Sequence, residues 1–228
     1  LATAWMLATA NAPFWRAALA GRDPSAPGTW AFAAALAALL GGLYVACIGL
    51  LAPRRALRPL LSLLVVTAAG SAWFIDHYGV FLDRAMMRNV LATHWGEARE
   101  LLNAGMVIHV LLWGVLPAAA LWWPRLTPRS RGRALAIRAG WTLAALALAV
   151  GSILPVFADF ASLMRNRKEV RHLVTPGNVV ASMAGNAWGR QRLANAPRVA
   201  VGADARLAPA WARRTRPTWA CRRSCPPR

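Results

Sequence analysis

Acidic residues and cysteines are scarce in this chain. Only 8 of its 228 residues are Asp or Glu, against 27 Lys or Arg, and three are Cys. Cys47 falls within an apolar run and is interpreted as a small core residue, whereas Cys221 and Cys225 form one isolated C-x-x-x-C pair. The sequence therefore supports neither a disulfide framework nor a zinc site.

Catalytic sequence motifs are missing as well. The chain contains no Walker loop, no G-x-S-x-G and no H-E-x-x-H. Its four His residues fall at no metal-ligand spacing, and His109, which interrupts an apolar stretch, is interpreted as a packed or interhelical group. We therefore predict no catalytic residue, no metal site and no cofactor in this chain.

Long apolar stretches dominate what is present. Hydrophobic residues make up 57% of the chain, and twelve residues are Trp, whereas soluble domains are about 45–50% apolar. A helix needs roughly 20 apolar residues to cross a bilayer. Stretches near that length lie at 1–20, 30–52, 57–75, 104–123 and 134–157, and none has the polar face of a soluble helix. The predicted fold is an all-α membrane protein with five transmembrane helices, the first of them clipped at Leu1.

The positions of arginine predict the orientation of these helices. Short loops rich in Arg face the cytoplasm. Two predicted loops are of this kind, and together they carry Arg54, Arg55, Arg58, Arg125, Arg129, Arg131 and Arg133. The 76–103 connection has four acidic residues against three Arg and should face the periplasm. We expect a multi-pass protein of the bacterial inner membrane, with everything after Phe157 in the periplasm.

A basic tail accounts for much of the net charge of +19. Residues 190–228 hold ten Arg and one Asp without helical or strand periodicity, which is typical of an irregular, solvated segment. Anionic lipid headgroups are the expected electrostatic partner, and nucleic acid is not. The predicted organisation is a transmembrane domain (1–157), a periplasmic bridging segment (158–189), and a linker with an irregular basic tail (190–228).

The segment DRAMMRNVLATHWGE, residues 83–97, is polar although it lies between two apolar stretches. Asn89, Thr93 and Glu97 are spaced by four residues and would form one stripe on an α-helix. We predict a periplasmic amphipathic helix here. Its stripe is interpreted either as a substrate-binding surface or as the wet face of an interfacial helix with four residues on lipid: Met86, Met87, Val90 and Leu91.

Three blocks of sequence resemble a known family. NAPFWRAAL (11–19), YGVFLDRAMMRNVLATHWGEARELLN (78–103) and FASLMRNRKEVRHLVTP (160–176) are similar to the membrane domain of the lipid A phosphoethanolamine transferases, the family of the colistin-resistance enzymes. The resemblance implies five transmembrane helices followed by a periplasmic, alkaline-phosphatase-like α/β domain. It also implies transfer of phosphoethanolamine from phosphatidylethanolamine to a lipid A phosphate through a phosphorylated Thr and zinc.

The same resemblance implies that Asn89, Thr93 and Glu97 bind substrate. Glu97 would pair with the ethanolamine ammonium, and Asn89 and Thr93 would donate hydrogen bonds to phosphate oxygens. His94 stands where many relatives carry Asp, a departure that changes the local charge of the site. The expected partners are therefore phosphatidylethanolamine, lipid A and the surrounding membrane lipids.

The carboxyl-terminal end departs from the family pattern. VGADARLAPAWARRTRPTW (201–219) resembles the linker that leads to a V-G-E-T strand with a zinc-binding Glu, but here ACRRSCPPR follows. We expect the catalytic domain and its zinc to be missing from this chain and the chain alone to be inactive. The tail after Thr218 is interpreted either as the product of a shifted reading frame or as a genuine short tail. The alternative function is a non-catalytic inner-membrane protein that retains only lipid binding.

Overall fold

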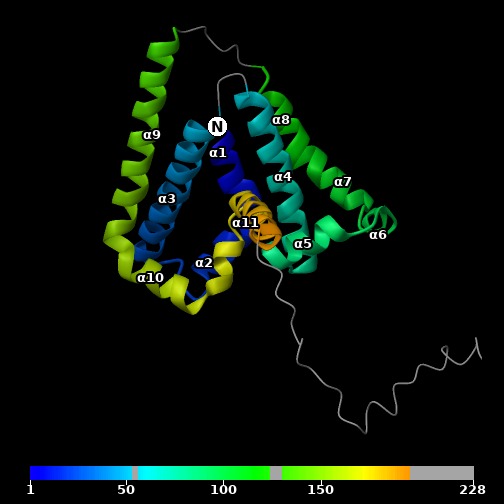
Figure 1. The fold of residues 1–228 in the computed structure, drawn as a ribbon. Helices are drawn as coiled ribbons and strands as arrows, with labels where there is room; N and C mark the ends of the chain where they lie inside the picture. The colour runs from blue at the N-terminus through cyan, green and yellow to red at the C-terminus, as the bar shows by residue number, and fades with distance from the viewer. Residues whose placement is uncertain (53–55, 124–129, 196–228) are drawn as a thin grey trace, which may run out of the picture. The chain divides into compact units, whose positions relative to one another are not determined.

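The described part of the chain is helical. The computed structural model describes residues 1–52, 56–123 and 130–195, and every regular element in these ranges is a helix (Figure 1). The chain divides into two units, Leu1–Gly189 and Arg190–Arg228, and the arrangement below is that of the first. The predicted all-α class is confirmed for these ranges, whereas the predictions for 196–228 lie outside the described residues.

The first apolar segment is a broken helix. It consists of α1 (Ala2–Trp5), a π-helical turn η1 (Met6–Ala10) and α2 (Ala12–Leu19). The break falls at Asn11, with φ −103° and ψ 18°, and Pro13 follows in the first turn of α2, where its missing N–H costs no hydrogen bond. None of these pieces alone is long enough to cross a membrane.

Two long helices, α3 (Pro27–Leu51) and α9 (Arg131–Ile153), lie side by side and antiparallel (Figure 1). A glycine allows the close contact. A Cβ on Gly42 would lie 2.5 Å from the carbonyl oxygen of Ala145 and 3.0 Å from the Cβ of Ala149. Small residues of this kind let membrane helices approach until their backbones touch.

A second group of helices packs around α4 (Leu57–Tyr78). Its partner is one apolar helix in three parts: α7 (Ala104–Val110), the π-helical turn η2 (Leu111–Val115) and α8 (Leu116–Ala120). Gly114 of η2 lies against the backbone of α4, because a Cβ there would be 3.3 Å from the Cα of residue 66. The missing side chain thus brings the two helices together.

Three helices are long and apolar enough to cross a membrane, and they span 27–51, 57–78 and 132–166. The last of them continues α9 through η3 (Leu154–Val156) and α10 (Phe157–Asn166). These helices confirm the predicted apolar spans at 30–52, 57–75 and 134–157. The stretch predicted at 104–123 is a shorter apolar helix, 104–120. Five crossings and the domain boundaries stay predictions.

The remaining helices lie at one end of the first unit. α5 (Arg84–Ala92), α6 (Trp95–Glu100), η4 (Lys168–His172) and α11 (Gly177–Asn195) follow or precede the ends of longer helices. Figure 1 shows α2, α5, α6 and α10 at the opposite end from the start of α4 and the start of α9. A core cluster is buried at this end and includes Phe14, Phe32, Leu36, Leu82, Met87, Val170 and Leu173.

Cys47 does not belong to a core. Its side chain is exposed on α3, whereas the preceding Ala46 is only 1% exposed. One residue advances an α-helix by about 100°, which turns Cys47 away from the packed face. The interpretation of Cys47 as a small core residue is therefore wrong.

Candidate substrate-docking surface

The start of α5 is fixed to the protein core. α4 ends at Gly79, whose φ of 61° lies in the left-handed region that favours glycine. After a short extended stretch, the Asp83 carboxylate accepts a hydrogen bond of 2.8 Å from the amide of Met86 and caps the helix. Leu82 and Met87, on either side of this cap, are both buried in the core cluster.

The predicted polar stripe does not lie on one helix. α5 ends at Ala92, the backbone of Thr93 is extended with ψ 130°, and α6 begins at Trp95, with His94 as its N-cap residue. The Thr93 hydroxyl donates to the carbonyl of Asn89 at 2.8 Å and so satisfies an oxygen that a longer helix would pair with an amide. The prediction of a single amphipathic helix is therefore wrong.

Two of the three predicted site residues present free polar groups. Asn89 on α5 and Glu97 in the first turn of α6 are exposed, and Thr93 between them is half-buried. Within the described ranges, neither the Asn89 side-chain amide nor the Glu97 carboxylate has a hydrogen-bond or ion-pair partner. Only Thr93 and Asn89 are joined directly, by the hydrogen bond from the hydroxyl. The amide and the carboxylate are available to a ligand.

The apolar neighbours divide between the core and the surface. Met87 is 7% exposed and lies in the core cluster, and Met86 packs against that cluster. Val90 and Leu91 remain exposed at 48% and 55%. The interpretation that all four rest on lipid is wrong for the two methionines, because α5 packs onto protein through its first turn.

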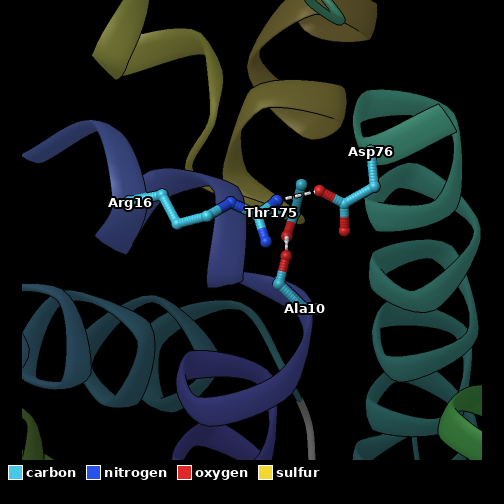
Figure 2. A network of polar contacts seen from close by, with 4 residues as sticks. All are labelled: Ala10, Arg16, Asp76 and Thr175. Carbon is cyan, nitrogen blue, oxygen red and sulfur yellow. Dashed lines mark hydrogen bonds and ion pairs between the residues drawn. The ribbon is translucent and has the colours of Figure 1, made fainter. Parts of the chain in front are cut away.

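A buried polar network joins the first apolar segment to the residues just before α11 and was not predicted. Asn11 and Thr175 are both 0% exposed. The Asn11 amide donates to the carbonyls of Met6 and Thr175 at 2.8 Å each, and its oxygen accepts from the Thr175 amide at 2.9 Å. The Thr175 hydroxyl donates to Ala10 at 2.8 Å (Figure 2), and the Tyr44 hydroxyl donates to the Thr175 carbonyl at 2.6 Å. The sequence showed Asn11 only as an interruption of an apolar run.

An ion pair joins α2 to α4 at the same end of the unit. Figure 2 shows the side chains of Arg16 and Asp76 reaching toward each other, and their charged groups are in contact. Both side chains are partly exposed, at 66% and 34%, so the pair adds little to stability. The two residues are 60 positions apart, and no spacing in the sequence pointed to the pair.

His109 packs between helices, as predicted. Its ring centroid lies 5.3 Å from that of Trp73, which itself stacks on His77 at 3.4 Å. His109 also contributes to a cavity of about 340 Å³ that is lined by Ala8, Thr9, Ala10, Ala69, His109 and Trp113. Among residues 1–52, 56–123 and 130–195, no three His, Cys, Asp or Glu side chains are placed to hold a metal ion.

These observations define a multi-pass helical membrane protein with an unpaired amide and carboxylate exposed at one end of its helices. A family model described as phosphoethanolamine transferase EptA/EptB matches residues 40–189, which include α5 and α6. The chain belongs to the EptA/EptB phosphoethanolamine transferase family. The resemblance predicted from the three sequence blocks is thus confirmed.

Individual relatives agree with this assignment. Phosphoethanolamine transferase EptA of Escherichia coli K12 is 34% identical over 154 residues, which are 67% of this chain and 28% of that protein. Phosphatidylethanolamine transferase Mcr-1 of Escherichia coli is 31% identical over 145 residues, 64% of this chain and 27% of that protein. This chain therefore spans well under half the length of these relatives.

A solved structure shows the same fold. The integral membrane protein lipooligosaccharide phosphoethanolamine transferase A of Neisseria meningitidis superimposes with a TM-score of 0.79 at 22% identity. The match covers 86% of this chain and 37% of that one. The helical arrangement of most of this chain is therefore that of a known membrane fold.

Proposed function

We propose that this chain is the membrane and substrate-docking domain of a transferase that moves phosphoethanolamine from phosphatidylethanolamine to a lipid A phosphate. One observation carries the proposal. The family match runs through α5 and α6, where the Asn89 amide and the Glu97 carboxylate are exposed without a partner in the described ranges. These are the groups that a zwitterionic headgroup needs, because it combines an ammonium with a phosphate.

Each docking residue has a distinct part in this proposal. Glu97 accepts hydrogen bonds from the ammonium, and Asn89 donates to phosphate oxygens. The Thr93 hydroxyl now donates to the Asn89 carbonyl and would have to rotate about χ1 to donate to phosphate instead. An ammonium drawn to the lipid boundary loses water, so the fixed charge of Glu97 matters most, and a hydrogen bond to a charged group is worth about 1.5–3 kcal/mol.

We also propose five crossings, with the Arg-rich loops in the cytoplasm and the docking surface in the periplasm. The 17 residues from Ala104 to Ala120 give a helix about 26 Å long, close to the roughly 30 Å of a bilayer core. The broken first segment supplies the other short crossing. α5 and α6 lie at the end opposite to the start of α4 and the start of α9 (Figure 1), which supports this orientation.

Zinc does not fit the docking surface. A structural zinc site takes four ligands and a catalytic one three, usually His, Cys or carboxylate. Asn89, Thr93 and Glu97 offer one carboxylate, and the described ranges hold no His, Cys, Asp or Glu cluster for a metal. In this proposal the surface binds and orients lipid, and the family's catalytic domain supplies the metal chemistry.

A chimera tests the docking role. Residues 1–195 are joined to the periplasmic domain of Escherichia coli EptA, and phosphoethanolamine on lipid A is measured by mass spectrometry. We expect Glu97→Gln to lower transfer about ten- to hundred-fold, because the counter-charge to the ammonium is lost. Glu100→Gln, an exposed carboxylate on the same short helix, is the matched control and should transfer normally.

The results distinguish a substrate-binding Glu97 from a Glu97 that only faces water on an interfacial helix. The 228-residue chain expressed without the added domain should attach no phosphoethanolamine, and it serves as the blank. If the Glu97→Gln chimera is as abundant in the membrane as the parent and transfers at the parent rate, the carboxylate is not a substrate ligand. The interfacial-helix interpretation, and with it a purely lipid-binding role, would then account better for these residues.

A further inference from the structure

α11 carries a stripe of buried polar side chains. Asn178, Ser182 and Asn186 are spaced by four residues and are only 5%, 5% and 8% exposed. A buried polar group is costly unless it is hydrogen-bonded. Each of the three side chains donates a hydrogen bond to a backbone carbonyl outside α11, so all three acceptors are backbone atoms.

Two of these bonds reach the start of α5. The Ser182 hydroxyl donates to the carbonyl of Leu82 at 3.1 Å, and the Asn186 amide donates to the carbonyl of Arg84 at 3.0 Å. These carbonyls lie on either side of Asp83, the residue that caps α5. Both bonds therefore hold the backbone at the start of α5 and not a side chain. Because every residue has a backbone carbonyl, substitutions within α5 leave these two acceptors in place.

A glycine leaves room for the Arg84 side chain beside these bonds. A Cβ on Gly185 would lie 2.7 Å from the guanidinium carbon of Arg84, closer than side chains normally come. The missing side chain thus makes room for Arg84 to cross α11 between Ser182 and Asn186. Sliding α11 along its axis would break both hydrogen bonds and move Gly185 out from under Arg84.

We propose that Ser182 and Asn186 are positioning residues that hold α5, and through it Asn89, in place for the substrate. The inference rests on the proposed function only where it concerns Asn89. α5 has nine residues and is too short to be stable without tertiary contacts. Asn89 is five residues beyond Arg84 in a helix that ends at Ala92. Within the described ranges no side chain of another helix donates a hydrogen bond to a later part of α5, so Asn89 moves with the first turn.

Hydrogen exchange on the full chain in detergent micelles tests the contact itself. Ser182→Ala and Asn186→Leu each remove one donor, and we expect the amides of residues 88–92 to exchange about two- to tenfold faster. Ser182→Thr keeps a hydroxyl and should retain the slow exchange. Ser162→Ala and Asn166→Leu are matched controls, because their mutual hydrogen bond of 3.2 Å lies within α10.

Unchanged exchange in α5 for both variants would overturn the proposal. If Asn186→Leu does not fold, Ser182→Ala decides the question, because it removes a single oxygen atom. Faster exchange throughout the first unit, rather than in α5, would also count against the proposal, since it would show general destabilisation rather than a specific contact.

Transfer by the chimera tests the positioning role. Ser182→Ala should lower transfer about two- to tenfold when Asn89 is present and should have little further effect in an Asn89→Ala background. If Ser182→Ala lowers transfer by the same factor with and without Asn89→Ala, the two residues act independently, and positioning through Asn89 is refuted. If Asn89→Ala alone leaves transfer unchanged, the docking proposal fails for that residue, and the exchange of α5 still decides whether Ser182 and Asn186 hold the helix.

Discussion

Replacing Asn11 by Leu should destabilise the protein strongly. Leu has the same branched arrangement of side-chain heavy atoms as Asn, but it removes three hydrogen bonds of 2.8–2.9 Å to Met6 and Thr175. It also leaves the Thr175 amide without an acceptor at a site that is 0% exposed. Three neutral hydrogen bonds at about 0.5–1.5 kcal/mol each, with the orphaned buried donor counted within that sum, predict a loss of about 1.5–4.5 kcal/mol.

Thermal unfolding in detergent micelles, followed by tryptophan fluorescence, measures this loss. For a chain of this size 1 kcal/mol shifts Tm by about 2–4 °C, so Tm should fall by roughly 3–18 °C. Asn166→Leu is the control, because Asn166 is exposed and its amide donates only within α10. Its Tm should stay near that of the parent.

A graded series makes the test stricter. Tyr44→Phe removes one of the two hydrogen bonds that the Thr175 carbonyl accepts, so its cost should be about 1 kcal/mol. The expected order of destabilisation is Asn11→Leu, then Tyr44→Phe, then Asn166→Leu. An Asn11→Leu protein that unfolds at the same temperature as Asn166→Leu would refute the reasoning about the buried network.

Two further predictions concern topology and packing. With the native cysteines replaced, a cysteine at Glu100 should react with a membrane-impermeant maleimide in intact cells, and one at Arg133 only after permeabilisation; the reverse pattern would contradict the proposed orientation. Gly42→Ala should lower Tm below that of Gly70→Ala, because a Cβ at 42 meets the Ala145 carbonyl whereas one at 70 meets nothing within 4 Å. Overpacking costs about 1–3 kcal/mol, so equal Tm values would exclude the close α3–α9 contact.

Apolar length was enough to locate the long helices. Hydropathy is a property of a local window, and the windows at 30–52, 57–75 and 134–157 gave helices α3, α4 and α9 with little shift. The break at Asn11 could not be predicted in the same way. Its partner Thr175 is 164 residues away, and only the folded chain brings the two together.

The sequence predicts where the exposed polar groups of the candidate docking surface lie, but not the shape of that segment. The four-residue spacing fits an α-helix, yet it does not exclude a break, and the Thr93 hydroxyl can replace the amide that the Asn89 carbonyl would lose. Met87 was interpreted as lipid-facing because its core partners Val170 and Leu173 come from a distant part of the sequence. Exposure and burial in this segment depend on those partners.

The geometry of α5 therefore depends on residues outside α5 and α6. Asn11 fixes Thr175 through the buried network, and Thr175 lies two residues before the start of α11. α11 in turn donates to the carbonyls of Leu82 and Arg84 at the start of α5. Polar side chains in apolar surroundings are stable only when each is paired, so such a sequence of bonds permits few alternative arrangements. α5 is too short to be stable alone. Its position therefore depends on hydrogen bonds that connect it, through α11 and Thr175, to the first apolar segment.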